Sequence, residues 1–185
     1  MRGLTHYRMS APKYEQVCAT GVFEDEKVEL LNGAIIKMTT SPPHDNAVIM
    51  LARSLRNLVG EDRWTVREEK PVRLGRFWRP QPDVAIVRGP QSNYATRRPG
   101  RLNIALIAEV ADSTYDKDAG VKLRRYESCG VPTYWIVDLN RRRVEVREMS
   151  ARGLSVPVYY QEHEEVPLTL DGQIYGRVRV ADLLT

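Results

Sequence analysis

The stretch IALIAEVADS, residues 104–113, decides the fold. Its first part, Ile104 to Val110, is an almost continuous apolar run, which is typical of a strand buried on both faces of a sheet. The following Asp112-Ser113-Thr114 offers helix caps, and Ser113 with Asp116 has the spacing of a capping box. We therefore predict a central strand that leads directly into a helix.

That helix should extend to about Ser128, because Gly130 and Pro132 then stop it. A second buried strand is expected at Thr133 to Asp138, and a third at Val144 to Met149. Between them lies Arg141 to Arg143, which reads as a solvated turn. A strand, a helix and a second strand in this order indicate a mixed α/β architecture.

The residues before this stretch supply the other elements of one sheet. Asn32-Gly33 should form a tight hairpin turn, because both residues tolerate positive φ angles. We also expect a loop at Ser41-Pro42-Pro43 and a basic surface loop at Gly89 to Gly100. The expected helices and strands are a helix at Ser10 to Cys18, hairpin strands at Lys27 to Leu31 and Ala34 to Met38, a helix at Val48 to Val59, strands at Trp64 to Leu74 and Val84 to Val87, and further strands through Tyr159-Tyr160 and Ile174 to Val180.

The size and composition limit the class of protein. The 185 residues fit one domain, residues 1–185, with 42% hydrophobic and 28% charged residues. Cys18 and Cys129 lie far apart and have no metal-ligand spacing, which suggests free thiols in a reducing cytoplasm. No apolar leader and no run of about 18 apolar residues occurs, so we expect neither export nor a membrane span.

A net charge of +4 and a pI of about 9.1 permit a nucleic-acid partner without requiring one. The basic residues are unevenly placed, and nine of the 28 flank two acidic residues of the predicted sheet, where a phosphate group would have to be held. These basic residues are Arg73, Arg76, Arg79, Arg97, Arg98, Arg101, Lys122, Arg124 and Arg125.

Two acidic residues occupy positions that packing alone does not favour. Asp83 begins a short apolar strand directly after Pro82, and Glu109 lies near the end of the apolar run. A buried carboxylate must be paired, protonated or bound to a metal. If the two strands are neighbours, two carboxylates and a strand carbonyl could bind Mg²⁺. Alternatively, Asp83 caps a turn and Glu109 pairs with an arginine.

A lysine on the following helix belongs to the same pattern. Tyr115, Asp118, Lys122 and Tyr126 recur at helical spacing and share one stripe. A lysine between two tyrosines would face the sheet, where it could orient a water molecule and offset developing negative charge. The alternative is an exposed ion pair between Asp118 and Lys122, one helical turn apart.

Asp83, Glu109 and Lys122, in this order and in these predicted elements, resemble the site motif of the PD-(D/E)xK nuclease superfamily. More narrowly, the sequence is similar to largely uncharacterised endonucleases that occur in many copies in some bacterial genomes. The resemblance covers about residues 10 to 180. The segments that carry it are Val28-Glu29-Leu30-Leu31-Asn32-Gly33 with Ile36 and Met38, His44, Gln81-Pro82-Asp83-Val84-Ala85, Ala108-Glu109-Val110-Ala111-Asp112-Ser113, Asp118 to Lys122 with Tyr126, and Gly130-Val131-Pro132-Thr133-Tyr134-Trp135-Ile136-Val137-Asp138.

The resemblance implies a restriction-endonuclease-like α-β-β-β-α-β core with an N-terminal helix and hairpin and extra C-terminal strands. It implies that Asp83, Glu109 and the carbonyl of Val110 bind the metal, and that Glu29 holds a metal-bound water. The superfamily lysine two positions after the second acid is Ala111 here. Lys122 would then be the functional substitute.

Several roles and functions stay open from the residues. His44 could contact a phosphate or a water, or it could be a capping or loop residue. Tyr126 could position Lys122 or belong to the core, as we expect for Tyr134 and Trp135. The leading hypothesis is hydrolysis of DNA with Mg²⁺ or Mn²⁺, in which the metal and Lys122 orient the attacking water.

The first alternative is a nucleic-acid-binding module on the same fold without turnover, which Ala111 favours. The second is a structural or assembly subunit, because a fold does not establish a function. A homodimer is plausible for a protein that cuts both strands of a duplex.

Overall fold

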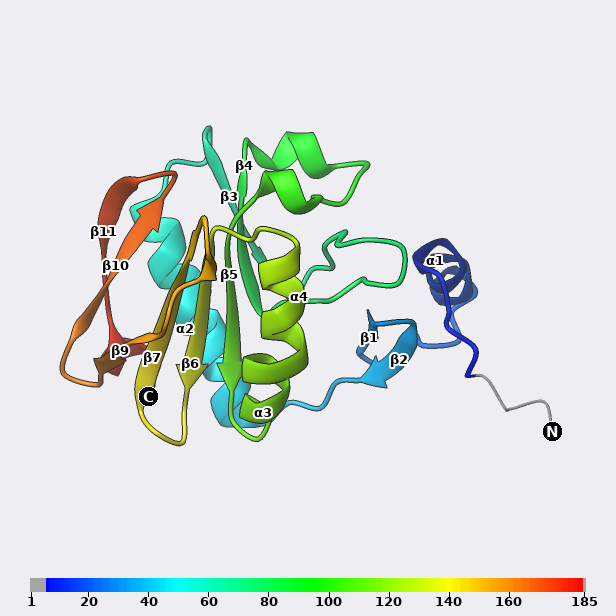
Figure 1. The fold of residues 1–185 in the computed structure, drawn as a ribbon, viewed down its shortest axis with the longest axis horizontal. Helices are drawn as coiled ribbons and strands as arrows, with labels where there is room; N and C mark the ends of the chain where they lie inside the picture. Colours follow the sequence, from blue (N-terminus) through cyan, green and yellow to red (C-terminus); the bar gives the residue numbers. More distant parts are fainter. Residues whose placement is uncertain (1–5, 185) are drawn as a thin grey trace.

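The protein is described by a computed structural model that covers residues 6–184. Its centre is a seven-stranded mixed sheet with the strand order β3-β4-β5-β6-β7-β8, in which β9 also pairs with β7 (Figure 1). The strands are β3 (Trp64–Glu68), β4 (Val84–Arg88), β5 (Ile104–Ala111), β6 (Thr133–Asp138), β7 (Arg143–Ser150), β8 (Gly153–Leu154) and β9 (Val158–Gln161).

Only one neighbouring pair in this sheet, β5 with β6, is parallel, and the other pairs are antiparallel. The parallel pair is joined by the helical segment made of α3 (Tyr115–Lys117), a π-helical turn at Asp118–Lys122 and α4 (Leu123–Ser128). With α2 (Pro42–Leu58) before β3, the order is α-β-β-β-α-β. The predicted mixed α/β core is therefore confirmed.

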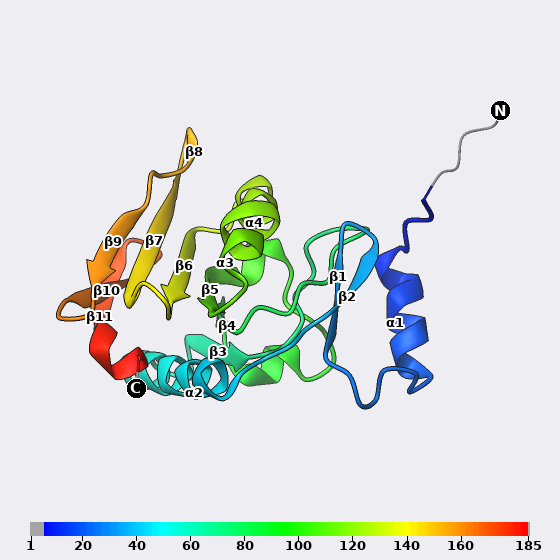
Figure 2. The ribbon, with the colours of Figure 1, turned by 90° about the horizontal axis from the view of Figure 1, so that it is seen from below.

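The sheet is buried between two helical layers, with α2 against one face and α3 and α4 against the other (Figure 2). Side chains alternate along β5, so that Leu106 and Ala108 pack toward α2 while Ile107 packs toward α4. Every residue of β5 is buried, as the apolar run predicted. Glu109 follows the same alternation and points to the α4 side.

A smaller unit precedes the sheet in the chain. Helix α1 (Ala11–Ala19) packs against the hairpin of β1 (Val28–Leu31) and β2 (Ala34–Lys37). Asn32 and Gly33 form the turn with φ angles of 52° and 86°, as predicted. The hairpin is joined to the loop 69–83 by a backbone bridge between Leu30 and Arg79.

The chain ends with a second hairpin, β10 (Glu165–Leu170) and β11 (Gln173–Arg179), which packs beside α2. Short 3₁₀ turns lie at Gln91–Tyr94, Arg101–Asn103 and Val180–Leu183. The extra C-terminal strands were predicted. No helix in the described part of the chain is long and apolar enough to span a bilayer.

Two boundaries differ from the sequence predictions. The predicted loop Ser41-Pro42-Pro43 is wrong, because α2 begins at Pro42 with Ser41 as its N-cap. Proline is well tolerated in a first helical turn, where its missing N–H has no helical partner. The predicted strand Trp64 to Leu74 is too long, because β3 ends at Glu68, before Glu69 takes a φ of 44°.

The predicted capping box also does not form. Thr114 is the N-cap of α3, but its side chain accepts no hydrogen bond from the backbone, and its hydroxyl donates to Asp118 at 2.6 Å. In addition, the expected continuous helix contains the π-helical turn at Asp118–Lys122. Such turns add a residue to a helix and often occur at functional sites.

Candidate active site

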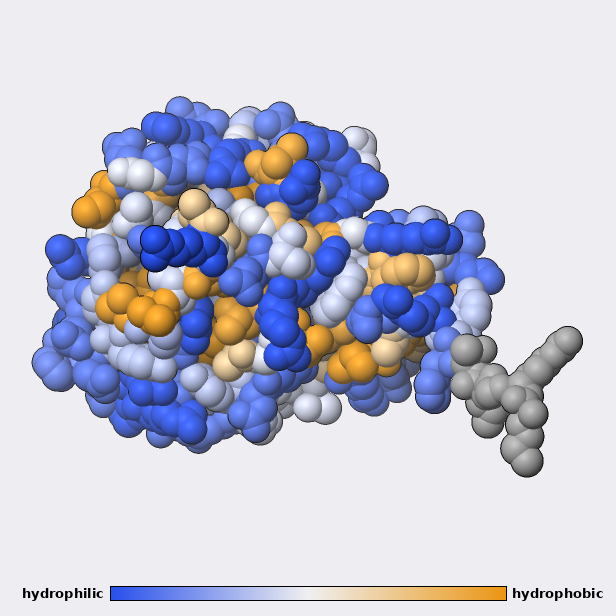
Figure 3. Space-filling view, in the orientation of Figure 1, coloured by the Kyte–Doolittle hydropathy of each residue, from blue (hydrophilic) through white to orange (hydrophobic). Residues whose placement is uncertain are grey.

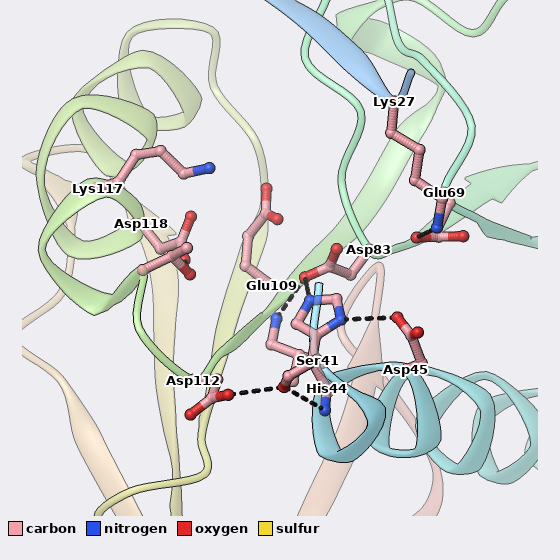
Figure 4. A network of polar contacts seen from close by, with 12 residues as sticks. Lys27, Ser41, His44, Asp45, Glu69, Asp83, Glu109, Asp112, Lys117 and Asp118 are labelled. Atoms are coloured by element: carbon pink, nitrogen blue, oxygen red, sulfur yellow. Dashed lines mark hydrogen bonds and ion pairs between the residues drawn. The ribbon is translucent and has the colours of Figure 1, made fainter. Parts of the chain in front are cut away.

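Three of the predicted site residues, Asp83, Glu109 and His44, meet where β5 ends and β4 begins (Figure 4). Because β4 and β5 are antiparallel and Val84 pairs with Ala108, Asp83 lies next to Glu109 and Val110 across the sheet. The N–H of Val110 donates to Asp83 Oδ2 at 2.7 Å. Asp83 is therefore anchored to β5, and only 3% of its surface is exposed.

Glu109 is buried and has two donors. Lys122 Nζ donates to Oε2 at 2.9 Å, and the Tyr126 hydroxyl donates to Oε1 at 2.6 Å. Burial raises the pKa of Glu109 to about 8, against the opposing effect of the Lys122 ammonium, and Asp83, Asp118 and Glu29 raise it further. Tyr126 therefore lies in the core and also holds this carboxylate.

Lys122 is almost fully buried, with 2% of its surface exposed, and its ammonium lies among three carboxylates. Nζ is 2.9 Å from Glu109, 3.5 Å from Asp118 and 3.6 Å from Glu29. Burial lowers the pKa of Lys122, but these carboxylates outweigh burial and raise it above its usual range. The exposed Asp118–Lys122 pair that we considered is wrong, since the pair forms inside the protein.

Glu29 reaches this cluster from β1, as the resemblance implied. Its Oε2 accepts the N–H of Gln81 at 3.2 Å, and its Oε1 lies 3.4 Å from Lys117 Nζ. Glu29 has no exposed surface. The hairpin turn therefore brings a carboxylate from the N-terminal unit to the side of Lys122.

His44 lies in the first turn of α2 and faces Asp83, as Figure 4 shows. Its Nε2 is 3.3 Å from Asp83 Oδ2, and its Nδ1 is 3.4 Å from Asp45 Oδ1. Burial lowers the pKa of His44, but Asp83 and Asp45 outweigh it and raise the pKa above 6.5. Its backbone N–H donates to Ser41 Oγ, so the residue takes part in the cap while its ring faces the acids.

Asp83, Glu109, Lys122 and His44 line a cavity of about 180 Å³ at the end of β5. Its walls carry carboxylates, hydroxyls and cations, together with a few apolar side chains. The lining residues are Ile36, Lys37, Met38, Thr39, Thr40, His44, Asp83, Glu109, Val110, Thr114, Lys117, Asp118 and Lys122. The predicted arginines are absent from this lining, so the expectation that they crowd around the acids is wrong.

Two members of the cluster were not predicted as site residues. Asp118 was considered only as a surface partner of Lys122, although its position on the stripe with Lys122 was a usable signal. Lys117 carried no signal, because it lies beside the stripe in sequence and reaches Glu29 only through the fold. Tyr134 was read as packing, and its buried hydroxyl also donates to the Asp118 carbonyl at 3.1 Å.

The donor set can be compared with the needs of a metal ion. Among residues 6–184, no three His, Cys, Asp or Glu side chains are grouped as ligands for a metal. However, Asp83, Glu109 and Asp118 present carboxylate oxygens to one small cavity, and the buried Oδ1 of Asp118 accepts no hydrogen bond. Oxygen ligands of this kind suit Mg²⁺, so the chemistry of the residues fits a hard divalent cation.

A mixed sheet between two helical layers, with one acid before β4 and another near the end of β5, defines a restriction-endonuclease-like fold of the PD-(D/E)xK class. Residues 11–175 match the family described as "Uma2: Putative restriction endonuclease". The chain belongs to this family. The match covers most of the chain, as the resemblance suggested.

A solved structure supports the same fold. The crystal structure of a putative nuclease belonging to DUF820 from Anabaena variabilis ATCC 29413 superimposes with a TM-score of 0.69, over 95% of this chain and 97% of that chain. The two sequences are 13% identical, so this similarity concerns the fold alone. A comparison with curated proteins finds no match to this sequence.

Proposed function

We propose that this protein is a metal-dependent endonuclease that hydrolyses phosphodiester bonds in DNA. The observation that supports the proposal best is a lysine ammonium buried beside Glu109 and Glu29 in the cavity that Asp83 lines. A cation of this kind is expensive to bury unless it serves the chemistry of the site or is fully paired. The family and the fold agree with nuclease activity.

In this proposal, Asp83, Glu109 and the carbonyl of Val110 would hold the metal, with Mg²⁺ as the cofactor and Mn²⁺ able to substitute. Bound Mg²⁺ supplies a Lewis acid that polarises the phosphate and makes a coordinated water more acidic. Tyr126 and the amide of Val110 already fix the two carboxylates through hydrogen bonds of 2.6 and 2.7 Å. Pre-positioned ligands of this kind reduce the cost of binding.

The protein groups around the acids would handle the water and the phosphate. Lys122 would orient the attacking water and offset the negative charge that develops on the phosphate. Glu29, which shares Lys122 with Glu109, would hold that water from the side of the hairpin. His44, whose ring faces Asp83, would donate to a phosphate oxygen. Lys122 on the helix would thereby replace the superfamily lysine, whose position is occupied by Ala111.

The alternative proposal is a nucleic-acid-binding or assembly module without turnover. Ala111 favoured this alternative, and the close pairing of Lys122 with Glu109 is also what a purely structural cluster would show. The two proposals differ in one measurable property, because only the endonuclease breaks DNA strands in a metal-dependent way. A homodimer would suit double-strand cleavage.

The test is cleavage of supercoiled plasmid and of branched DNA with Mg²⁺ or Mn²⁺. We compare the wild type with Asp83→Ala and Lys122→Ala, and we use Asp25→Ala and Lys70→Ala as controls at exposed positions. Metal-dependent nicking that is lost in the two site variants and kept in the two controls is expected. If the wild type leaves every substrate intact, or if Asp83→Ala cleaves normally, the proposal is wrong.

A further inference from the structure

The cavity at the end of β5, which Asp83, Glu109 and Asp118 line, is called the acidic cavity from here on. A second and larger cavity lies beside it, between α1, the loop 69–83, the 3₁₀ turn at Arg101–Asn103 and the end of α4. Its volume is about 740 Å³, within the usual range of ligand-binding pockets. Among residues 6–184, seven arginines and no acidic residue line it. They are Arg73, Arg76, Arg79, Arg97, Arg98, Arg101 and Arg125. We call this feature the arginine cavity.

The arginine cavity has far more positive charge than the chain as a whole. The net charge of the protein is +4 and the seven lining arginines contribute +7, so all other residues together total −3. One nearby carboxylate, Glu15, pairs with both Arg79 and Arg98 at 2.7 Å. Within residues 6–184, the other five arginines form no salt bridge with a carboxylate. A concave surface with this imbalance attracts anions.

Three of the guanidinium groups are held in place by aromatic rings. Arg125 lies 5.3 Å from the centre of the Trp78 ring, and Arg97 lies 5.3 Å from that of Tyr94. Arg76 lies 5.3 Å from the Phe77 ring. Stacking of this kind orients the planar guanidinium group, which can then donate two parallel hydrogen bonds to a phosphate.

The loop backbone is adapted to this arrangement at Gly75. The residue has a φ of 125°, and a Cβ atom there would lie 2.4 Å from Nη2 of Arg125. Arg125 passes over Gly75 and donates to the carbonyl of Leu74. The φ angle of Gly75 disfavours any other residue, and a side chain at this position would also force the guanidinium group of Arg125 to shift.

The arginine cavity and the acidic cavity share structural elements. Lys122 of the acidic cavity and Arg125 of the arginine cavity are three residues apart on one helical segment, which is about 5 Å along a helix axis. On the other side, Arg79 pairs through its backbone with Leu30, the neighbour of Glu29. In the space-filling view, the surface between the 3₁₀ turns and α1 is mostly hydrophilic (Figure 3).

We propose that the arginine cavity binds backbone phosphates of the DNA strand that is cut, beside the scissile bond. The inference rests on the proposed endonuclease function. A nucleic-acid strand that enters the acidic cavity needs cations along its path, and the acidic cavity supplies few. The exposed side chain of Leu102 in the arginine cavity would contact a sugar or a base. The occupant is thus a strand with several phosphates.

The test measures DNA binding without catalysis, in the presence of a chelator. The variant Arg73→Gln/Arg76→Gln/Arg101→Gln changes three exposed cavity arginines that form no salt bridge. The matched control, Arg53→Gln/Arg152→Gln/Arg177→Gln, removes the same charge from three exposed arginines outside the cavity. Fluorescence anisotropy of a labelled oligonucleotide, as single strand and as duplex, gives the affinity over a series of salt concentrations.

We expect the cavity variant to bind the preferred form of DNA at least about tenfold more weakly than the wild type at moderate salt. The slope of log affinity against log salt should fall by about 2 to 3, since each lost phosphate contact removes about 0.7 to 0.9. The control variant should keep most of the wild-type slope. Circular dichroism and urea unfolding of both variants show whether the fold is intact.

The proposal is overturned if the cavity variant and the control lose affinity equally, or if neither loses any. It is also overturned if inorganic triphosphate binds in an arginine-dependent way while DNA does not, which would make the cavity a small-anion site. Failure here is distinguishable from failure of the endonuclease proposal, because plasmid cleavage with metal is measured separately. If the protein cuts DNA but binds it independently of these arginines, only the proposed role of the arginine cavity in DNA binding is refuted.

Discussion

At the scale of single residues, the central feature is an ammonium group enclosed by carboxylates. Lys122 lies within 3.6 Å of Glu29, Glu109 and Asp118, and all four side chains are buried. The negative charges outnumber the positive charge, and Asp83 adds another carboxylate to the same cavity. Such a cluster is held together by its cation, so removal of the lysine should affect stability as well as activity.

Substitution of Lys122 by methionine should lower the free energy of unfolding by about 3 kcal/mol at pH 8, because it leaves buried carboxylates without their cation. The loss should be smaller at pH 5, where the carboxylates can take up protons. Urea unfolding in a chelator measures both values. Lys70→Met, at an exposed position, should change stability by less than about 0.5 kcal/mol. If the two substitutions change the free energy of unfolding equally, the Lys122 ammonium does not stabilise the buried carboxylates.

A pH dependence of stability follows from Glu109. Its pKa rises from an ordinary value of 4.5 to about 8 in the folded protein, so the folded state binds more protons than the unfolded state between these values. The contribution of Glu109 to stability should therefore be fully present below pH 4.5 and be lost as the pH rises through 8. The raised pKa values of His44 and Asp118 act in the same direction.

The measurement is the free energy of unfolding from pH 5 to 9 in a chelator, for the wild type and for Glu109→Gln. The glutamine cannot titrate but can still accept the Tyr126 hydroxyl, so the pH dependence should become shallower. Parallel curves for the two proteins would show that Glu109 titrates normally in the folded state.

At the scale of elements, the π-helical turn at Asp118–Lys122 directs two charged side chains into one cavity. A π-helical turn widens the helix locally, and its hydrogen bonds are less favourable than those of an α-helix. The turn contains Gly120, which further weakens it. The π-helical turn that carries Lys122 is therefore less stable than an α-helical turn without glycine would be.

Replacement of Gly120 by alanine should stabilise the protein by about 0.5 to 1 kcal/mol, because alanine favours helix and its Cβ would meet no atom within 4 Å. Gly130→Ala is the matched control. Its Cβ would also lie in open space, but the residue has a φ of 70°, so the same change should destabilise by about 1 kcal/mol. Thermal and urea unfolding measure both. A loss of stability for Gly120→Ala would mean that the π-helical turn requires glycine.

At the scale of the whole molecule, the N-terminal hairpin, the sheet and both helical layers all contribute to one acidic cavity. Metal binding at such a convergent site should stabilise the entire fold, since the ligands are brought together only when the chain is folded. Mg²⁺ at about a hundred times its dissociation constant would add about 2.7 kcal/mol.

Mg²⁺ should therefore raise the unfolding midpoint of the wild type and leave that of Asp83→Asn unchanged relative to its own metal-free value. The midpoint is measured by thermal unfolding over a series of metal concentrations. Asp25→Asn, at an exposed position, should keep the wild-type response. An equal rise in all three proteins would place the metal elsewhere on the molecule.

The sequence by itself determined the main elements of the fold and their order. The apolar run at Ile104 to Val110, the Asn32-Gly33 turn and the glycine and proline after Ser128 are local signals, and the corresponding elements are present. These features depend on periodicity and on backbone preferences within a few residues. The predicted boundary at Pro42 was wrong although Ser41 and Pro42 are local signals of a helix start, and the one at Glu68 was wrong because the strand ends where Glu69 takes a φ of 44°.

Only the tertiary structure decided which charged residues share a cavity. Glu29 and Lys117 are 88 residues apart in sequence and lie 3.4 Å apart in space, and no local pattern predicts that pairing. The arginines expected around the acids, except Arg124, instead line their own cavity, because the fold brings the loop 69–83, residues 97–101 and the end of α4 together there. Charge recognition depends on distance and burial, and both are set by the packing of remote segments rather than by sequence spacing.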